Sequence, residues 1–391
     1  MIRRLDTDTM VALTLAKDPS MTWTRREFTG LLGAAAIGSW NALASADEKT
    51  AESARRSGKP ARERIRIGQI GTTHAHANKL SVYRQSDDYE VVGLVEPDPT
   101  RRAVLQSQAP FRDIPLMTQE ELLNVPGLQV VLVETEVRDL LSTAEACVTA
   151  GKHIHLDKPA GESLSHFKRV LEIARSKRIL VQMGYMFRYN PGVVMLHEFL
   201  KQGWLGEIFE VQTLMSKVVP PGDRLKLAEY PGGIMFELAC HVVDLVIGLL
   251  GAPTKITPFS QHVSSIADGL LDSQLAVFEY PKALASVRGI AVEIDGGSRR
   301  HLTVCGTEGT FHIQPLDNPS VRVALSKPRG KYKAGYQDIA LPKYTRYVDD
   351  AADMARILRG EAENRFPYAH DLAVQTALLT ASGVEPEPKK N

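Results

Sequence analysis

Three ionisable residues, Glu237, His241 and Asp244, interrupt an otherwise almost wholly apolar segment of the chain. Their spacing places them on one face of a helix expected over 233–250. Ionisable groups in one stripe of a buried helix are costly unless they are paired or serve a site. Because an imidazole titrates near neutral pH, His241 is a candidate general acid–base. A satisfied structural network is the alternative.

Lys158 is the second candidate. It lies in the stretch 151–161, where a short apolar strand over 153–156 leads into Asp157-Lys158-Pro159. A residue before proline is restricted to extended conformations, so we expect Lys158 at the stiff end of that strand. From there its ammonium can reach a bound ligand. A surface Lys-Pro turn is the alternative for this motif taken alone.

The loop after the first expected strand, 65–70, stands where a dinucleotide would bind. Such a loop brings backbone N–H groups to a pyrophosphate at a helix N-terminus. Gly71 occupies the first position of a G-x-G-x-x-G pattern, whereas Thr73 and His76 replace the second and third glycines. Glu96 follows 25 residues after Gly71, close to the spacing of a carboxylate that binds a ribose hydroxyl. An acid there favours NAD over NADP, because it would repel a 2′-phosphate.

His74 and His76 support a competing hypothesis, because two histidines at i, i+2 after a first strand resemble the metal pair of amidohydrolase barrels. That chemistry needs further ligands at later strand ends, and residues 133–135 and the strands beyond them offer no convincing set. His153 and His155 repeat the spacing, but in a strand both point the same way. We therefore predict no metal site.

The elements that position these candidates change character along the chain. Strands alternating with helices predict a parallel, doubly wound α/β sheet, with strands at 65–70, 90–95, 130–133, 153–156 and 180–184. Later strand-like segments have few helices between them and predict an antiparallel or mixed α+β sheet, at 208–218, 275–280, 284–292, 302–304 and 321–325. Further helices are expected at 347–359 and 371–383.

The N-terminal segment is typical of a twin-arginine export signal. Arg25 and Arg26 precede a weakly apolar run over 31–44, and 44–46 is a small-x-small cleavage pattern. The run is shorter than the about 20 residues of a membrane span, although an uncleaved anchor is the main alternative. We expect the twin-arginine machinery to export the folded protein to the periplasm or another extracytoplasmic space.

Composition limits the partners. A formal charge of +1 on 391 residues gives no basic footprint for nucleic acid, and favours a small, neutral or mildly charged ligand. The three cysteines are too few and too scattered for a disulfide framework or a zinc site. An exported chain without disulfides agrees with folding before export.

The ordered set of motifs resembles the Gfo/Idh/MocA family of NAD(P)-dependent oxidoreductases over about residues 64–383. Residues 151–159 resemble its G-K-H-V…E-K-P element, with Asp157 for glutamate. Residues 187–191 resemble its R-F-N-P segment, and 232–244 its G-G-G…D…H…D helix, with Glu237 for aspartate. His370-Asp371-Leu372 resembles the start of its closing helix.

The resemblance implies a Rossmann domain over 64–185 and an open-sheet substrate and oligomerisation domain over 186–385, after a signal (1–46) and a linker (47–63) and before a tail (386–391). It implies that the catalytic residues are Lys158, His241 and Glu237. The implied cofactor-binding residues are Gly71, Thr72, Thr73, His74, Glu96, Thr135, Lys158 and Arg188. The implied substrate-binding residues are Lys158, Tyr189, Asn190, Glu237 and His241. A homo-oligomer is expected.

These residues together predict hydride transfer between a sugar-like secondary alcohol, a carbohydrate or polyol, and NAD. His241 would take the hydroxyl proton while Lys158 stabilises the alkoxide. Because free NAD is scarce outside the cytoplasm, we expect the cofactor to be tightly bound. A redox-neutral glycoside-cleaving enzyme or lyase on the same scaffold, and a non-catalytic sugar-binding protein, are the alternatives.

Overall fold

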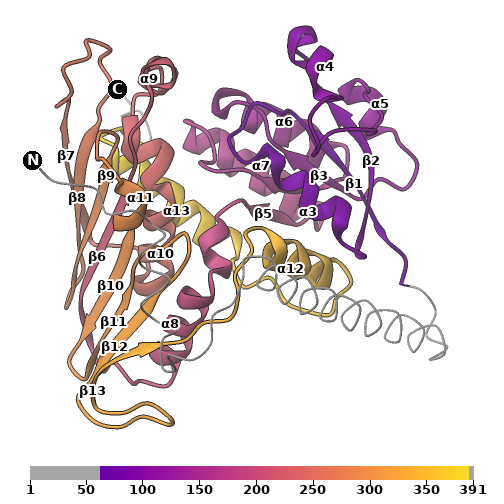
Figure 1. The fold of residues 1–391 in the computed structure, drawn as a ribbon. Coiled ribbons are helices and arrows are strands. Elements are labelled where there is room, and N and C mark those ends of the chain that lie inside the picture. Colours follow the sequence, from indigo (N-terminus) through magenta and orange to yellow (C-terminus); the bar gives the residue numbers. More distant parts are fainter. Residues whose placement is uncertain (1–61, 387–391) are drawn as a thin grey trace, which may run out of the picture. The chain divides into compact units, whose positions relative to one another are not determined.

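The computed structural model describes residues 62–386 (Figure 1). The predicted export signal, nearly all of the linker and most of the tail lie outside the described residues. Within the described range, no helix has both the length and the apolar character that crossing a membrane requires.

The first sheet, sheet A, is parallel and has five strands in the order β2-β1-β3-β4-β5. Its strands are β1 (Ile65–Ile70), β2 (Tyr89–Val95), β3 (Val130–Val133), β4 (His153–Leu156) and β5 (Val181–Met183). Every residue of β3 is buried, as expected for a central parallel strand covered on both faces. The predicted doubly wound α/β sheet is confirmed.

Helices cover both faces of sheet A. Its connections contain η1 (Ala77–Lys79), α3 (Leu80–Gln85), α4 (Pro99–Leu105), α5 (Gln119–Leu123), α6 (Val137–Thr149) and α7 (Leu164–Ser176). Leu140 of α6 and Phe167 of α7 belong to one apolar core cluster, whereas Leu80 and Tyr83 of α3 belong to a second. That second cluster also includes Met354, from a helix near the end of the chain.

The second sheet, sheet B, has eight strands in the order β13-β12-β11-β10-β6-β9-β8-β7. Only the β6–β9 pair is parallel, so the predicted mixed sheet is confirmed. Burial alternates along β8, as expected for a sheet with one face on the core. The strands are β6 (Ile208–Ser216), β7 (Lys255–Gln261), β8 (Ser273–Glu279), β9 (Leu284–Ile290), β10 (His301–Gly306), β11 (Gly309–Ile313), β12 (Val321–Leu325) and β13 (Gly335–Ile339).

The helices of the second half connect the two sheets' cores. They are η2 (Met186–Tyr189), α8 (Pro191–Lys201), α9 (Pro221–Ala228), the π-helical turn η3 (Met235–Ala239), α10 (Cys240–Leu250), α11 (Gly296–Arg299), α12 (Val348–Leu358) and α13 (Tyr368–Ala381). Tyr89 of β2 donates a hydrogen bond to the carbonyl of Ala351 at 2.7 Å, which ties α12 to sheet A.

The uniform α-helix predicted over 233–250 is wrong in its first turns, because a π-turn over Met235–Ala239 replaces it.

Candidate active site

The carboxyl ends of β1, β3 and β4 lie side by side, because parallel strands end at the same edge of a sheet. Gly71 follows β1 with φ of 91°. A Cβ atom there would lie 2.6 Å from the backbone nitrogen of Thr135 and 2.7 Å from the carbonyl oxygen of Glu134. Only glycine fits, so the close approach that the first glycine of a dinucleotide loop provides is present.

A cavity of about 590 Å³ lies at this edge. Glu96, at the end of β2, is buried, and its carboxylate accepts hydrogen bonds from the Thr72 hydroxyl and from the backbone N–H of Asp98. The cavity brings together Gly71, Thr73, Glu96 and Thr135 among the predicted cofactor residues, while Thr72 reaches it through Glu96.

His74 turns inward from the loop. Its Nε2 lies 3.0 Å from the carbonyl oxygen of Lys158, and its Nδ1 lies 3.1 Å from Oδ2 of Asp157. His76 lies beside it, with Nδ1 3.1 Å from the other carboxylate oxygen, Oδ1, of Asp157. Burial lowers the pKa of His76 to about 4, against the opposing effect of Asp157. The imidazole of His76 is therefore neutral at neutral pH.

Lys79 is a buried cation below this loop. Its Nζ lies 2.8 Å from Oδ2 of Asp157 and 2.9 Å from Oε1 of Glu134. Burial opposes the charged form, but Asp157 and Glu134 outweigh it and raise the pKa of Lys79. Burial and the neighbouring Asp157 raise the pKa of Glu134, whereas His74, Lys79 and His76 hold the pKa of Asp157 well below its usual value despite burial.

The sequence patterns did not identify Lys79, Glu134 and Asp157 as site residues. Asp157 stood only as a substitution in a motif, and Lys79 fell within an expected helix without any distinguishing pattern. A signal was present in the spacing His74-x-His76-x-x-Lys79, which places three basic residues on one short loop and turn. Their common partner is more than 75 residues away in the sequence, at the end of β4.

Lys158 is buried and lies in a bend two residues after the end of β4. Its Nζ donates a hydrogen bond to the carbonyl oxygen of Glu237 at 2.8 Å and lies 3.5 Å from Oε1 of the same residue. Burial lowers the pKa of Lys158, but Cys240, Glu237 and Asp157 raise it more, so its ammonium form is favoured. Lys158 is thus a fixed positive charge.

Glu237, in the π-turn η3, lies between two lysines. Its Oε2 is 3.5 Å from Nζ of Lys217, opposite the contact with Lys158. Burial raises the pKa of Glu237, but the two lysines and then His74 lower it more, to about 2. Its carboxylate is therefore ionised at all pH values of interest.

His241 follows one helical turn later and is buried. Its ring centroid lies 5.7 Å from that of His76 and 5.3 Å from that of Phe187. Burial, followed by Lys158 and His76, lowers the pKa of His241 well below its usual value. In the described part of the chain its Nδ1 has no hydrogen-bond partner. A neutral imidazole with an unsatisfied nitrogen beside a fixed ammonium can accept a proton from a bound ligand.

Asp244 does not share these surroundings, although helical spacing predicted one stripe. Its carboxylate receives bonds from Arg188 at 2.6–3.0 Å and lies 3.1 Å from Nε2 of His370. Arg188 also donates to Asp371 at 2.7 Å, and its guanidinium lies 4.2 Å from the ring centroid of Phe366. Asp244 therefore belongs to a buried structural ion-pair cluster.

Three predicted site residues are held by other contacts. Arg188, predicted to contact the cofactor, is occupied by Asp244 and Asp371. Tyr189 donates its hydroxyl hydrogen to Asp353 at 3.1 Å. The buried Asn190 caps α8 through the backbone N–H of Gly192 and donates to the carbonyl of Leu316 at 2.7 Å. These contacts give all three side chains structural roles, and their predicted contacts with cofactor or substrate stay predictions.

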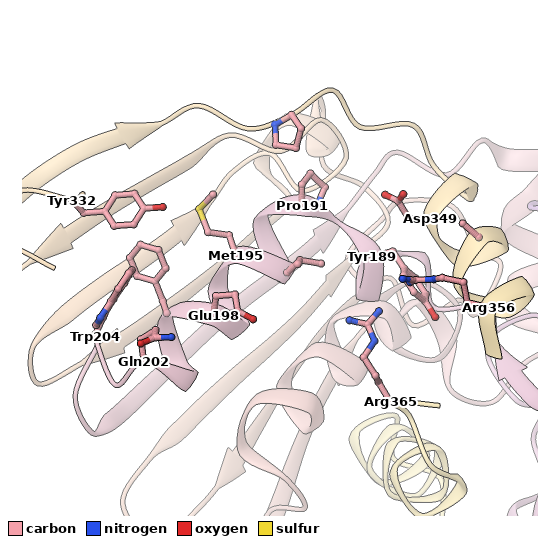
Figure 2. Close-up of a pocket in the computed structure, with 14 residues that line it drawn as sticks. Tyr189, Pro191, Met195, Glu198, Gln202, Trp204, Tyr332, Asp349, Arg356 and Arg365 are labelled. Atoms are coloured by element: carbon pink, nitrogen blue, oxygen red, sulfur yellow. The ribbon is translucent and has the colours of Figure 1, made fainter. Parts of the chain in front are cut away.

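A larger cavity of about 980 Å³ lies elsewhere, between α8, α12 and the segments around Tyr332 and Arg365 (Figure 2). Trp204 and Tyr332 lie at one end of it, and Arg356 and Arg365 at the other. Its lining includes none of the loop histidines, Lys158 or His241. Cavity size alone therefore does not identify the chemical centre of this protein.

Comparison with known families agrees with this geometry. Residues 65–185 match the oxidoreductase family described as having an NAD-binding Rossmann fold, and residues 193–312 match the GFO/IDH/MocA C-terminal domain. The chain belongs to the Gfo/Idh/MocA oxidoreductase family. The resemblance drawn from the ordered motifs is thereby confirmed, as are an NAD(P)-dependent dehydrogenase type of enzyme and NAD as cofactor.

Individual relatives are distant. The uncharacterized oxidoreductase YdgJ of Escherichia coli is 23% identical over 83% of this chain and 96% of its own length. An inositol 2-dehydrogenase of Salmonella typhimurium is 25% identical over 73% of this chain and 80% of its own. The solved UDP-N-acetylglucosamine 3-dehydrogenase of Acidithiobacillus ferrooxidans superposes with a TM-score of 0.68 at 16% identity, covering 83% of this chain and 99% of that one. This last likeness shows the fold.

The residues at the sheet edge fit NAD. A Cβ-excluding glycine follows β1, and a buried carboxylate ends β2 beside an open cavity, as a bound ribose and pyrophosphate require. Gly71, Thr73, Glu96 and Thr135 would hold the nucleotide. The position of the third glycine is filled by His76, whose side chain turns away from this cavity toward Asp157.

Proposed function

We propose that this protein transfers hydride between a sugar-like or cyclitol-like secondary alcohol and NAD(H), with Lys158 and His241 as its acid–base pair. The observation that carries the proposal is a buried ammonium, that of Lys158, whose charge together with burial lowers the pKa of the buried imidazole of His241. The substrate class is supported by relatives named as inositol dehydrogenases.

Each side chain has a distinct task in this proposal. His241 accepts the proton of the substrate hydroxyl, because its lowered pKa keeps the imidazole neutral. Lys158 stabilises the negative charge that develops on the substrate oxygen, and its bond to the Glu237 carbonyl holds it in place. Bound NAD supplies the acceptor for the hydride. Glu237 positions Lys158 and Lys217 and offers carboxylate oxygens to substrate hydroxyls.

We also propose that the cofactor is tightly bound and that the protein is exported. Both proposals rest on the twin-arginine pattern over residues 24–46, since an exported enzyme must carry its dinucleotide with it. Denaturing the purified full-length protein and analysing the released small molecules by mass spectrometry tests tight binding. If the denatured protein releases no NAD but the native protein binds added NADH, only the proposal of tight cofactor binding is contradicted.

Activity is tested by following absorbance of NADH with inositol isomers and simple sugars. Lys158→Met is expected to reduce kcat/KM by about 10²–10⁴-fold, as for loss of a group acting in the transition state. Lys255→Met is the matched control, because that lysine is exposed and pairs with Glu279 on the surface. Equal activity of both variants, or failure of the wild-type protein to bind NADH at all, would sink the proposal. Cleaved product without net NADH would favour the redox-neutral alternative.

A further inference from the structure

The loop after β1 and the end of β4 bring three metal-binding side chains together. One donor atom each from His74, His76 and Asp157 lies within 4.8 Å of the other two. We propose that these residues form a binding site for one divalent transition-metal ion of the zinc class. The metal pair that the sequence suggested lacked a further ligand at a later strand end, and Asp157 is that ligand.

The contacts around His74 orient its two ring nitrogens. The carbonyl oxygen of Lys158 can only accept, so the Nε2 atom 3.0 Å away carries a proton. The opposite nitrogen, Nδ1, faces Oδ2 of Asp157 at 3.1 Å. A metal ion bound between these two atoms would take the place of any proton on Nδ1.

The surroundings of the cluster are those of a supported metal ligand set. A metal-bound histidine usually donates its other ring N–H to a carbonyl or carboxylate, as His74 does to Lys158. Asp157 is oriented by the backbone N–H of Lys158 at 2.7 Å and by Nζ of Lys79 at 2.8 Å. Both Asp157 oxygens lie 3.1 Å from an imidazole nitrogen, a separation that suits two ligands of one ion.

The charged groups near the cluster are balanced, with three lysines against three carboxylates. Lys79 is shared between Asp157 and Glu134, so two carboxylates face one ammonium. Lys158 is matched by Glu237, which also pairs with Lys217. The unpartnered, buried Nδ1 of His241 belongs to a ring whose centroid is 5.7 Å from that of His76. The described contacts thus leave this buried nitrogen near the cluster without a hydrogen-bond partner.

The donor set decides which metals fit. Two imidazole nitrogens and one carboxylate oxygen suit Zn²⁺, Co²⁺, Ni²⁺ or Fe²⁺, whereas Ca²⁺ and Mg²⁺ prefer sites made only of oxygen. Three protein ligands also leave coordination positions open, as in catalytic rather than structural zinc sites. A metal here would lie at the edge of sheet A, next to the residues proposed for proton transfer.

The test uses the full-length protein after treatment with a chelator. Calorimetric titration with Zn²⁺ is expected to show one ion per chain, and Co²⁺ is expected to give visible absorption bands of nitrogen and oxygen coordination. His76→Gln, a partly exposed position, should weaken Zn²⁺ binding by at least about 10–100-fold, and Asp157→Asn should do the same. His166→Gln is the control, because His166 pairs with Glu145 on the surface of α7.

Binding of Zn²⁺ by the wild-type protein that His76→Gln and His74→Gln leave unchanged would overturn the proposal, as would no binding by the wild-type protein. Circular dichroism of each variant separates loss of a ligand from loss of the fold. NADH binding, followed by its fluorescence on the same samples, reports on the proposed dehydrogenase function independently. Metal binding without NADH binding would therefore refute the proposed dehydrogenase function and leave the proposed metal site standing.

Discussion

The ammonium of Lys158 donates to the backbone carbonyl of Glu237 at 2.8 Å and stands 3.5 Å from its carboxylate. This contact joins the end of β4 in sheet A to the π-turn η3 that precedes α10. Because both the main chain and the side chain of one residue hold the lysine, its charge is fixed before any ligand arrives. Such preorganisation is what a stabilising charge in an active site needs.

The pH dependence of the reaction should report His241. A base must be neutral to accept a proton, and burial with Lys158 and His76 lowers its pKa well below the usual 6.5. We therefore expect kcat/KM for alcohol oxidation to remain flat as pH falls through 6.5 and to decrease only at lower pH. Steady-state kinetics across this pH range measure kcat/KM and test the prediction. A loss of activity already complete at pH 6.5 would contradict the proposed role.

We expect Gly71 to be required for NADH binding, whereas Gly151, another glycine with positive φ, should tolerate replacement by alanine. Gly71→Ala places a Cβ 2.6 Å from Thr135 nitrogen, and Gly151, with φ of 77°, has nothing within 4 Å of such an atom. We expect Gly151→Ala to cost only about 1–2 kcal/mol for the backbone conformation, and Gly71→Ala to cost more and to abolish NADH binding. Urea unfolding and NADH fluorescence compare them; equal costs would refute the steric argument.

Arg188 should matter for stability and not for cofactor affinity. Arg188→Met leaves Asp244 and Asp371 buried without their cation, which is expected to cost about 3–5 kcal/mol. Adding Asp244→Asn and Asp371→Asn removes the uncompensated charges and should recover much of that loss. Urea unfolding measures the stability and NADH titration the affinity. A weakened NADH affinity at unchanged stability would restore the cofactor role that the sequence suggested.

Asp350 should destabilise the fold as pH rises. Burial raises its pKa from 3.8 to about 7, and its Oδ1 has no partner among the described residues. Between these two values the folded state holds a proton that the unfolded state has released, so this contribution to stability is present below pH 3.8 and is lost as pH rises through 7. Asp350→Asn should therefore raise stability near pH 8, by at most about 4 kcal/mol.

Urea unfolding at pH 5 and pH 8 measures that effect. The wild-type protein should lose more stability between the two values than Asp350→Asn does. Asp338→Asn, at an exposed position that pairs with Arg322 on the surface, is the control and should leave the difference unchanged. Identical pH responses of wild type and Asp350→Asn would contradict the assignment.

The strands of sheet A could be predicted because each is a short, largely buried segment between polar turns, and β3 is wholly apolar. Three strands of sheet B could not. β7 contains a proline and is mostly exposed, and β13 is an exposed edge strand, so neither carries an alternating apolar pattern. β11 is only five residues long and follows directly on the turn after β10. Their pairing comes from neighbouring strands rather than from their own composition.

The π-turn is a similar case. An apolar segment from Gly233 to Leu250 carries the same periodic signal for an α-helix whether or not one turn is wider. In the structure the wide turn Met235–Ala239 holds Glu237 against Lys158, and the α-helix that follows it places Asp244 against Arg188. Only packing against the surrounding elements distinguishes these registers.

The sequence by itself predicted the family, the order of the two sheets and the candidate residues Gly71, Glu96, Lys158 and His241, because each belongs to a local motif with its own spacing. Only the tertiary structure decided which side chains share a partner. His74 and His76 follow β1, Asp157 follows β4, and they meet because the carboxyl ends of parallel strands lie at one edge of the sheet. That relationship has no signature in any local stretch of sequence.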